Sequence, residues 1–95
     1  MAAYLSGTIQ VTDPEGYEEY RRRVPGVIAA YGGRYLVRGG ACSVLEGDAR
    51  PGRQVILEFP DMARLMAFYD SDDYRPLMAI RRRCSTGDIV VIEGV

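Results

Sequence analysis

The order of strand-like and helix-like segments along the chain limits its fold more than any other feature. Segments with alternating apolar and polar residues predict four strands, at residues 3–11, 34–46, 54–59 and 88–93. Apolar residues at steps of three and four predict one helix at residues 14–31 and two short helices, after Asp61 and after Ser71. The order is therefore β-α-β-β-α-β, with the second helical segment broken in two.

Local signals define the limits of the first helix. Asp13 supplies an N-cap oxygen and Pro14 fits the first helical position, while Gly32 suits a left-handed C-terminal cap. Pro25 lies inside this helix and lacks the N–H that would bond to the carbonyl of Arg21. We expect a kink or a break there.

Glycines and turn residues separate the later elements. Gly39 and Gly40 predict a bend within the second strand, and residues 47–52 have the composition of a turn, so the second and third strands should form a hairpin. Gly87 is expected to close the last helix.

This element order matches the ferredoxin-like fold of the α+β class. We expect one domain, residues 1–95, in which right-handed crossovers place the helices on one face of a four-stranded antiparallel sheet. The other face would be bare, and the last strand would be an edge although residues 89–92 are apolar on both sides. A homodimer that stacks the bare faces would cover both surfaces.

Composition excludes several kinds of chemistry. The chain contains no His, Lys, Trp or Asn, and all 12 basic residues are Arg. Serine or cysteine nucleophiles activated by His, His-ligated metals, Lys Schiff bases and P-loops are therefore excluded, and we expect no metal and no cofactor. A net charge of −1 argues against nucleic acid as a partner.

The apolar content argues against a membrane partner. Although 47% of the residues are hydrophobic, no apolar run approaches the roughly 20 residues of a membrane helix. Cys42 and Cys84 form no C-x-x-C motif, and no signal-peptide pattern is seen. We therefore expect a reduced, cytoplasmic protein.

Motifs along almost the whole chain resemble one bacterial family. They are Val11-Thr12-Asp13-Pro14, Tyr17 with Tyr20, Gly32-Gly33-Arg34-Tyr35, Arg38-Gly39-Gly40, Leu45-Glu46-Gly47, Leu57-Glu58-Phe59-Pro60, and Phe68-Tyr69-Asp70-Ser71 with Tyr74 and Arg81. In this number and order they are similar to the domain-of-unknown-function family numbered 1330. The resemblance implies a dimeric α+β barrel, a superfamily that also holds small monooxygenases, muconolactone isomerase-like enzymes and decarboxylases.

Strand alternation suggests a catalytic pair. Glu58 is expected on the sheet face that also carries Tyr4 and Thr8, and Arg34 and Arg38 are expected to share one face of the neighbouring strand. An Arg and a Glu in an enclosed space can bind a substrate carboxylate and act as a general base, so Glu58 and Arg38 are paired as candidate catalytic residues and Arg34 is a candidate ligand-binding residue. The alternative is a structural ion pair at the dimer interface.

Further candidates lie on the helices. Tyr69, a third candidate catalytic residue, and Ser71 lie where the two short helices meet and would present hydroxyls to a cleft, or serve as a core Tyr and an N-cap. Tyr17 and Tyr20 bring polar groups to the inner stripe of the first helix and suit either a ligand pocket or a core. Arg81 is in register with that interior and could reach a carboxylate.

Two functions are consistent with these residues. One is a cofactor-free small-molecule enzyme or binder, of isomerase or monooxygenase type, with a cleft between sheet and helices. The other is a non-catalytic dimerisation or regulatory module. The two differ in whether Thr8, Arg38 and Glu58 surround an open cavity or close into saturated hydrogen bonds.

Overall fold

The computed structural model describes residues 1–50 and 52–95. Four strands and three helices follow one another as β1 (Ala3–Val11), α1 (Pro14–Ala30), β2 (Arg34–Arg38), β3 (Arg53–Phe59), α2 (Met62–Tyr69), α3 (Arg75–Cys84) and β4 (Ser85–Glu93). None of the helices in this part of the chain is long and apolar enough to cross a bilayer.

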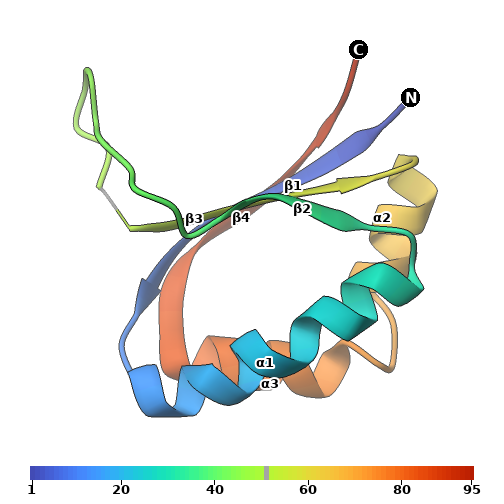
Figure 1. The fold of residues 1–95 in the computed structure, drawn as a ribbon, viewed down its shortest axis with the longest axis horizontal. Coiled ribbons are helices and arrows are strands. Elements are labelled where there is room, and N and C mark those ends of the chain that lie inside the picture. Colours follow the sequence, from blue (N-terminus) through green and yellow to red (C-terminus); the bar gives the residue numbers. More distant parts are fainter. Residues whose placement is uncertain (51) are drawn as a thin grey trace.

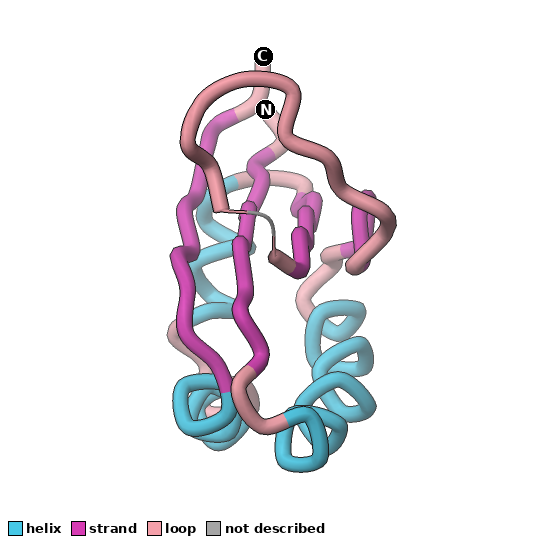
Figure 2. The backbone as a smooth tube through the Cα atoms, turned by 90° about the vertical axis from the view of Figure 1, so that its left-hand side faces the viewer, coloured by secondary structure: helices cyan, strands magenta, loops and turns pink. Residues whose placement is uncertain are grey.

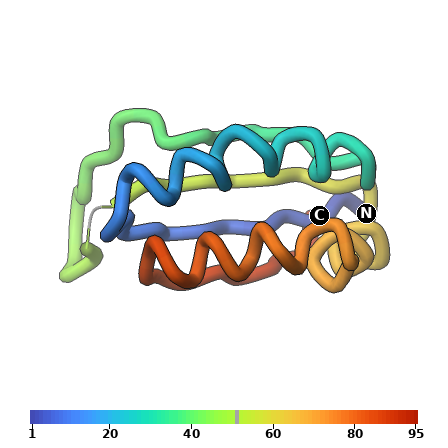
Figure 3. The backbone as a smooth tube through the Cα atoms, turned by 90° about the horizontal axis from the view of Figure 1, so that it is seen from below, coloured from blue at the N-terminus to red at the C-terminus, as the bar shows by residue number. Residues whose placement is uncertain are grey.

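The four strands form one antiparallel sheet in the order β2-β3-β1-β4. The predicted ferredoxin-like arrangement is confirmed. All three helices lie on the concave side of the curved sheet (Figure 1). Viewed from below, α1 and α3 run side by side across it, with both chain ends at the same end of the sheet (Figure 3). The opposite sheet face is bare, as expected.

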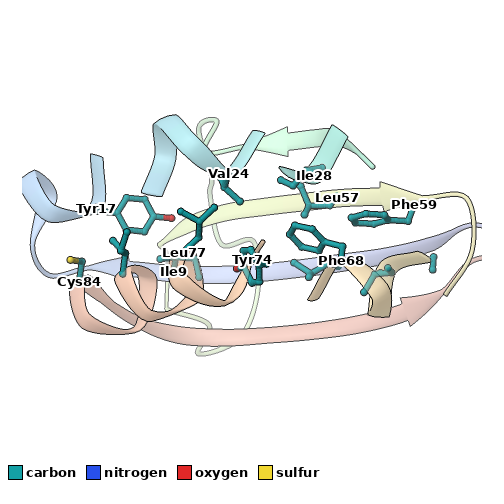
Figure 4. Packing of buried hydrophobic residues seen from close by; sticks show 14 residues of the cluster. Ile9, Tyr17, Val24, Ile28, Leu57, Phe59, Phe68, Tyr74, Leu77 and Cys84 are labelled. Carbon is teal, nitrogen blue, oxygen red and sulfur yellow. The ribbon is translucent and has the colours of Figure 1, made fainter. Parts of the chain in front are cut away.

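The core lies between the sheet and the helices. It combines aliphatic residues from all layers with the rings of Tyr17, Phe59, Phe68 and Tyr74 (Figure 4). Phe68 is the centre of this aromatic group, with its ring centroid 5.3 Å from Phe59 and 4.5 Å from Tyr74. Two of these four rings, those of Tyr17 and Tyr74, bring hydroxyls into the space between sheet and helices.

Helix α1 is continuous across Pro25, so of the two alternatives a break is wrong. Asp13 caps its N-terminus by accepting a hydrogen bond from the N–H of Gly16 at 3.2 Å, and Gly32 follows its end with a φ of 83°. The carbonyl of Arg21, for which Pro25 has no N–H, instead accepts a hydrogen bond from Nη2 of Arg38 at 2.8 Å. A side chain of β2 therefore replaces the missing helix bond.

The second strand is shorter than predicted. It ends at Arg38, and residues 39–50 and 52 form a long loop that projects beyond the sheet on the side away from the helices (Figures 1 and 2). The alternation at 41–46 therefore did not indicate a strand: β3 offers pairing partners only as far as Gln54 and Arg53, where the N–H of Gly39 bonds to the Gln54 carbonyl at 2.8 Å. Pro51, part of the predicted turn, lies outside the described residues.

The last strand begins earlier than predicted. Helix α3 ends at Cys84 and β4 begins at the next residue, so Gly87 lies within the strand and does not close the helix. Gly87 pairs with Ile9 of β1, and a Cβ atom at this position would collide with the carbonyl oxygen of Thr8. The glycine therefore allows β4 to approach β1 closely.

Candidate functional site

A cavity lies between the concave side of the sheet and the helices. Polar groups reach it from Tyr17, Tyr20, Tyr74, Arg53 and Arg81, and its walls are aliphatic and aromatic. Its volume of about 40 Å³ exceeds the roughly 10–15 Å³ that one water needs. It is far below the roughly 300 Å³ of a small ligand pocket, so a larger ligand requires side chains at its mouth to move.

Two tyrosine hydroxyls and one guanidinium meet in this cavity. The hydroxyls of Tyr20 and Tyr74 are 2.8 Å apart, and Nε of Arg81 donates to the Tyr74 hydroxyl at 3.3 Å. Burial, together with the neighbouring Tyr74, raises the pKa of Tyr20 far above its ordinary value. The Tyr20 hydroxyl therefore keeps its proton at neutral pH, and the Arg81 guanidinium also stays protonated, so both groups can donate hydrogen bonds.

Arg81 is unusual because it is buried without a counter-ion. Its residue is 8% exposed, and no described residue gives its Nη2 atom a hydrogen-bond partner. Nε of Arg53, which also lines the cavity, is buried and unpartnered in the same way. Most buried polar groups are hydrogen-bonded, so two unsatisfied guanidinium nitrogens at one cavity need an explanation.

The other two arginines that line the cavity are already engaged. Arg21 forms an ion pair with Glu18 at 3.0 Å on the exposed side of α1. Arg38 donates to the Arg21 carbonyl, and its guanidinium carbon lies 4.6 Å from the ring centroid of Tyr35. These two exposed side chains lie toward solvent and so form the mouth of the cavity.

Glu58 lies on the opposite, bare face of the sheet. One of its carboxylate oxygens accepts from Nε of Arg34 at 2.7 Å and the other from the hydroxyl of Tyr4 at 3.2 Å. The hydrogen bond from Arg34 lowers the pKa of Glu58 below its usual value, and the hydrogen bond to Glu58 raises the pKa of Tyr4. Thr8 on the same face donates to Gln54 at 3.2 Å.

The expected pairing of Arg38 with Glu58 is wrong. A β-bulge between Tyr35 and Val37 inserts one residue into β2, so that Arg34 pairs with Glu58 but Arg38 pairs with Val55. The extra residue reverses the alternation. Arg34 and Arg38 therefore lie on opposite faces, and Arg38 faces the helices.

The remaining candidates fall into two groups. Tyr17, Tyr20 and Arg81 line the cavity, as expected of pocket residues. Tyr69 lies outside it, on a shallow groove that also includes Arg81 and Ile89. Ser71 is a capping residue: its hydroxyl donates to the carbonyl of Phe68 at 2.8 Å and accepts from the N–H of Tyr74 at 3.0 Å.

Sequence reasoning missed two cavity residues, Arg53 and Tyr74. Tyr74 was named only as part of the family motifs, although its hydroxyl joins Tyr20 to Arg81. Arg53 is the first residue of β3 and pairs with Ile9, so its side chain belongs to the helix-facing side. The alternation of Val55 and Leu57 would have placed Arg53 on that face had it been extended back by one step.

The described residues contain no metal-ligating cluster: no three Cys, Asp or Glu side chains come close enough to hold an ion. The polar groups available to a ligand in the cavity are therefore tyrosine hydroxyls and guanidinium groups.

Comparisons with solved structures place this architecture in the class of small ferredoxin-like proteins. A protein of unknown function from Rhodopseudomonas palustris, RPA0582, matches with a TM-score of 0.77 and 18% identity over 99% of this chain and 82% of that one. A dimeric ferredoxin-like protein of unknown function from Jannaschia sp. CCS1 matches with a TM-score of 0.63 and 14% identity over the full length of both chains.

SnoaB, a cofactor-independent oxygenase from Streptomyces nogalater, has a TM-score of 0.67 and 12% identity over 99% of this chain and 93% of that one. At these identities the likeness concerns the fold. A search among curated proteins found no match. The model of the domain of unknown function DUF1330 matches residues 2–95, and the chain belongs to this family, as its motifs indicated.

Proposed function

We propose that this protein binds a small aromatic molecule in the cavity between sheet and helices and acts on it as a cofactor-free enzyme of isomerase or monooxygenase type. The observation that carries the proposal is the convergence of the Tyr20 and Tyr74 hydroxyls and the Arg81 guanidinium in one partly enclosed apolar space. A few convergent polar groups in an apolar pocket are typical of a ligand site.

These groups suit the stabilisation of negative charge. Hydroxyl and guanidinium donors that are fixed in a water-poor space stabilise an oxygen atom on which charge develops during a reaction. No described carboxylate lines the cavity, so the general-base role expected for Glu58 is not part of this proposal. The oxygenase activity of SnoaB, a protein of the same fold, supports chemistry of this kind.

The proposal is tested by a thermal-shift screen with phenols, aromatic acids, lactones and keto acids. A ligand at a hundredfold excess over its Kd stabilises the folded state by about 2.7 kcal/mol, which shifts the Tm of a domain of this size by several degrees. Tyr74→Phe should reduce the shift because it removes the hydroxyl between Tyr20 and Arg81. Tyr31→Phe is the matched control, since the Tyr31 hydroxyl bonds to Asp73 outside the cavity.

If the ligand raises the Tm of Tyr74→Phe as much as that of the wild type, the proposal that the ligand binds in this cavity is contradicted. The absence of any shift, in a sample that light scattering shows to be a stable dimer, would contradict the function and favour the non-catalytic module. That second candidate is supported by the bare sheet face, where Thr8 and Glu58 are engaged with neighbouring side chains and surround no cavity with Arg38.

We propose in addition that the protein is a homodimer that covers its bare sheet face. Val90 and Ile92 of β4 point to this face and are 51% and 53% exposed. The dimeric neighbour from Jannaschia has the same fold. The dimer gives twice the mass of one chain by light scattering at micromolar concentration.

We also propose a reducing, cytoplasmic environment. Cys42 is exposed and Cys84 is buried, and both are free thiols. Free thiols of this kind persist where glutathione and thioredoxin keep cysteines reduced.

A further inference from the structure

We infer that the ligand of the cavity is an aromatic anion whose carboxylate or enolate group is held by Arg81 and Arg53. The inference rests on the proposed function and specifies the chemical class of its ligand. It is carried by the charges that surround the cavity and by two guanidinium nitrogens that have no partner among the described residues.

The charge around the cavity is of one sign. Four arginines line it, at positions 21, 38, 53 and 81, and no Asp or Glu is among the described residues that do so. The ion pair with Glu18 engages Arg21, and the Arg21 carbonyl engages Arg38. Arg53 and Arg81 form no ion pair with any described residue. The pKa of Glu18 is lowered by the hydrogen bond from Arg21 and further by the charge of nearby Arg53. Arg81, in contrast, has no carboxylate at ion-pair distance in that part of the chain.

Burial makes this imbalance costly for Arg81. The residue is nine-tenths buried, and within the described part of the chain its guanidinium donates a hydrogen bond to the hydroxyl of Tyr74, which is no counter-ion. A buried charge without a partner is strongly destabilising, and a water molecule in the cavity would solvate it without neutralising it. An anionic ligand would supply both the missing charge and the missing hydrogen-bond acceptors.

The geometry of a guanidinium favours an oxyanion in particular. Arg81 uses Nε for the Tyr74 hydroxyl and retains a buried, unused Nη2. Arg53 retains a buried, unused Nε. Carboxylate oxygens accept bonds of this kind at short distance, and charge-assisted bonds are about twice as strong as neutral ones.

The walls of the cavity define the rest of the ligand. They consist of aliphatic side chains from the sheet and α1 and of the rings of Tyr17, Tyr20, Tyr35, Phe68 and Tyr74. Once side chains at the mouth have moved to enlarge the cavity, a flat aromatic body can contact such rings in an offset or edge-to-face arrangement. The chemistry of the site therefore combines one anionic group with one ring system.

The fold also places Arg53 where the anion would bind. Gly39, at the end of β2, has a φ of 68°, and a Cβ atom there would collide with the guanidinium of Arg53. The glycine thus lets the Arg53 side chain pass along the backbone toward the cavity. Arg81 also borders the outer groove next to Tyr69 and Ile89, which gives an anion a second approach to the same guanidinium.

The test uses two ligands that share a ring system and differ in the group attached to it, an anionic carboxylate in one and a neutral amide in the other. Calorimetric titration should show that 2-naphthoate binds the wild-type protein at least tenfold more tightly than 2-naphthamide, which has the same ring and no charge. Arg81→Met, which keeps an unbranched side chain as far as the position of Nε and removes the charged guanidinium, should abolish this preference. Arg83→Met is the matched control on the exposed side of the same helix and should retain it.

The outcomes separate the inference from the function on which it rests. Equal affinity for the amide and the carboxylate would contradict the inference that the ligand is an anion. A preference for the carboxylate that persists in Arg81→Met would contradict the role of Arg81. Neither result would contradict the proposal that the cavity binds a small molecule. Failure of both compounds to bind, together with no response to the broader panel above, would overturn the proposed function as well.

The unliganded variant gives a second, independent readout. If Arg81 is retained for a ligand, Arg81→Met removes a buried unpaired charge and should unfold at an equal or higher Tm than the wild type. A fall in Tm of several degrees would show that Arg81 stabilises the fold itself and would overturn the inference.

Discussion

Glu58 and Arg81 show how differently two ionisable residues can be used in one small domain. Glu58 accepts hydrogen bonds from Arg34 and Tyr4 at the bare sheet face, so its charge is compensated locally. Arg81 is buried, its Nε atom donates to the hydroxyl of Tyr74, and its Nη2 atom has no partner among the described residues. The hydrogen bonds of Glu58 stabilise the fold, whereas Arg81 retains a hydrogen-bond donor that a ligand can use.

The compensation of Glu58 predicts a pH dependence of stability. Because the bond from Arg34 lowers the pKa of Glu58 in the folded state, the unfolded chain binds more protons in the acid range. The stabilisation is therefore present above the unfolded pKa of about 4.3 and is lost as the pH falls through the lower folded pKa. Urea unfolding at fixed protein concentration should show that wild type and Glu58→Gln differ less in their free energy of unfolding at pH 3 than at pH 6.

Arg34→Gln is the control for this experiment. It removes the largest cause of the lowered pKa and should itself weaken the pH dependence that Glu58 contributes. A constant difference between wild type and Glu58→Gln over the whole range would contradict this account of the pair.

Among the elements, α1 and β2 are joined at the place where the helix lacks a bond. Pro25 provides no N–H for the Arg21 carbonyl, and Arg38 of β2 supplies the missing donor at 2.8 Å. The proline that would weaken an isolated helix thus creates an attachment point for the neighbouring strand. Arg38 is a structural residue at this junction as well as part of the cavity mouth.

A double-mutant cycle tests this junction. Arg38→Met should cost about 1 kcal/mol of unfolding free energy, and the cost should fall by about half or more when Pro25→Ala restores an N–H for the Arg21 carbonyl. Chemical denaturation of the four variants measures this coupling. Arg34→Met is the control. Because Arg34 bonds to Glu58, the unfolding free energy that this substitution costs should be the same with Pro or Ala at residue 25.

At this scale, sequence patterns predicted the element order well and the site only in part. The caps of α1 and the strands β1 and β3 follow from local signals at Asp13, Gly32 and the alternating residues. The bulge in β2 has no such signal, because it depends on how β3 pairs with Tyr35 and Val37. That single inserted residue places Arg38 and Glu58 on opposite faces of the sheet, so the two do not form the expected pair.

The candidate site residues that the structure places at the cavity share one property. Tyr17, Tyr20 and Arg81 lie on helices whose inner stripe is visible from the spacing of apolar residues. Arg53 and Tyr74 were missed because their role depends on contacts between distant elements, such as the bond from Tyr74 to Tyr20 on α1. Tertiary contacts of this kind leave no local pattern.

For the whole molecule, the sheet separates two environments. Its concave face and the helices enclose the tyrosine and arginine groups, while its bare face presents Tyr4, Glu58, Val90 and Ile92. The proposed homodimer would cover the second face, and the proposed ligand would occupy the first. The central claim is therefore that binding occurs between sheet and helices.

Methyl NMR of the isoleucines tests this claim most directly. Ile9, Ile28 and Ile89 line the cavity, whereas Ile56 and Ile92 lie on the bare face of β3 and β4. Titration of protein labelled at the isoleucine δ1-methyl groups with 2-naphthoate should shift the resonances of the first group and leave those of the second unchanged. Shifts confined to Ile56 and Ile92 would place the ligand at the bare face and contradict the account.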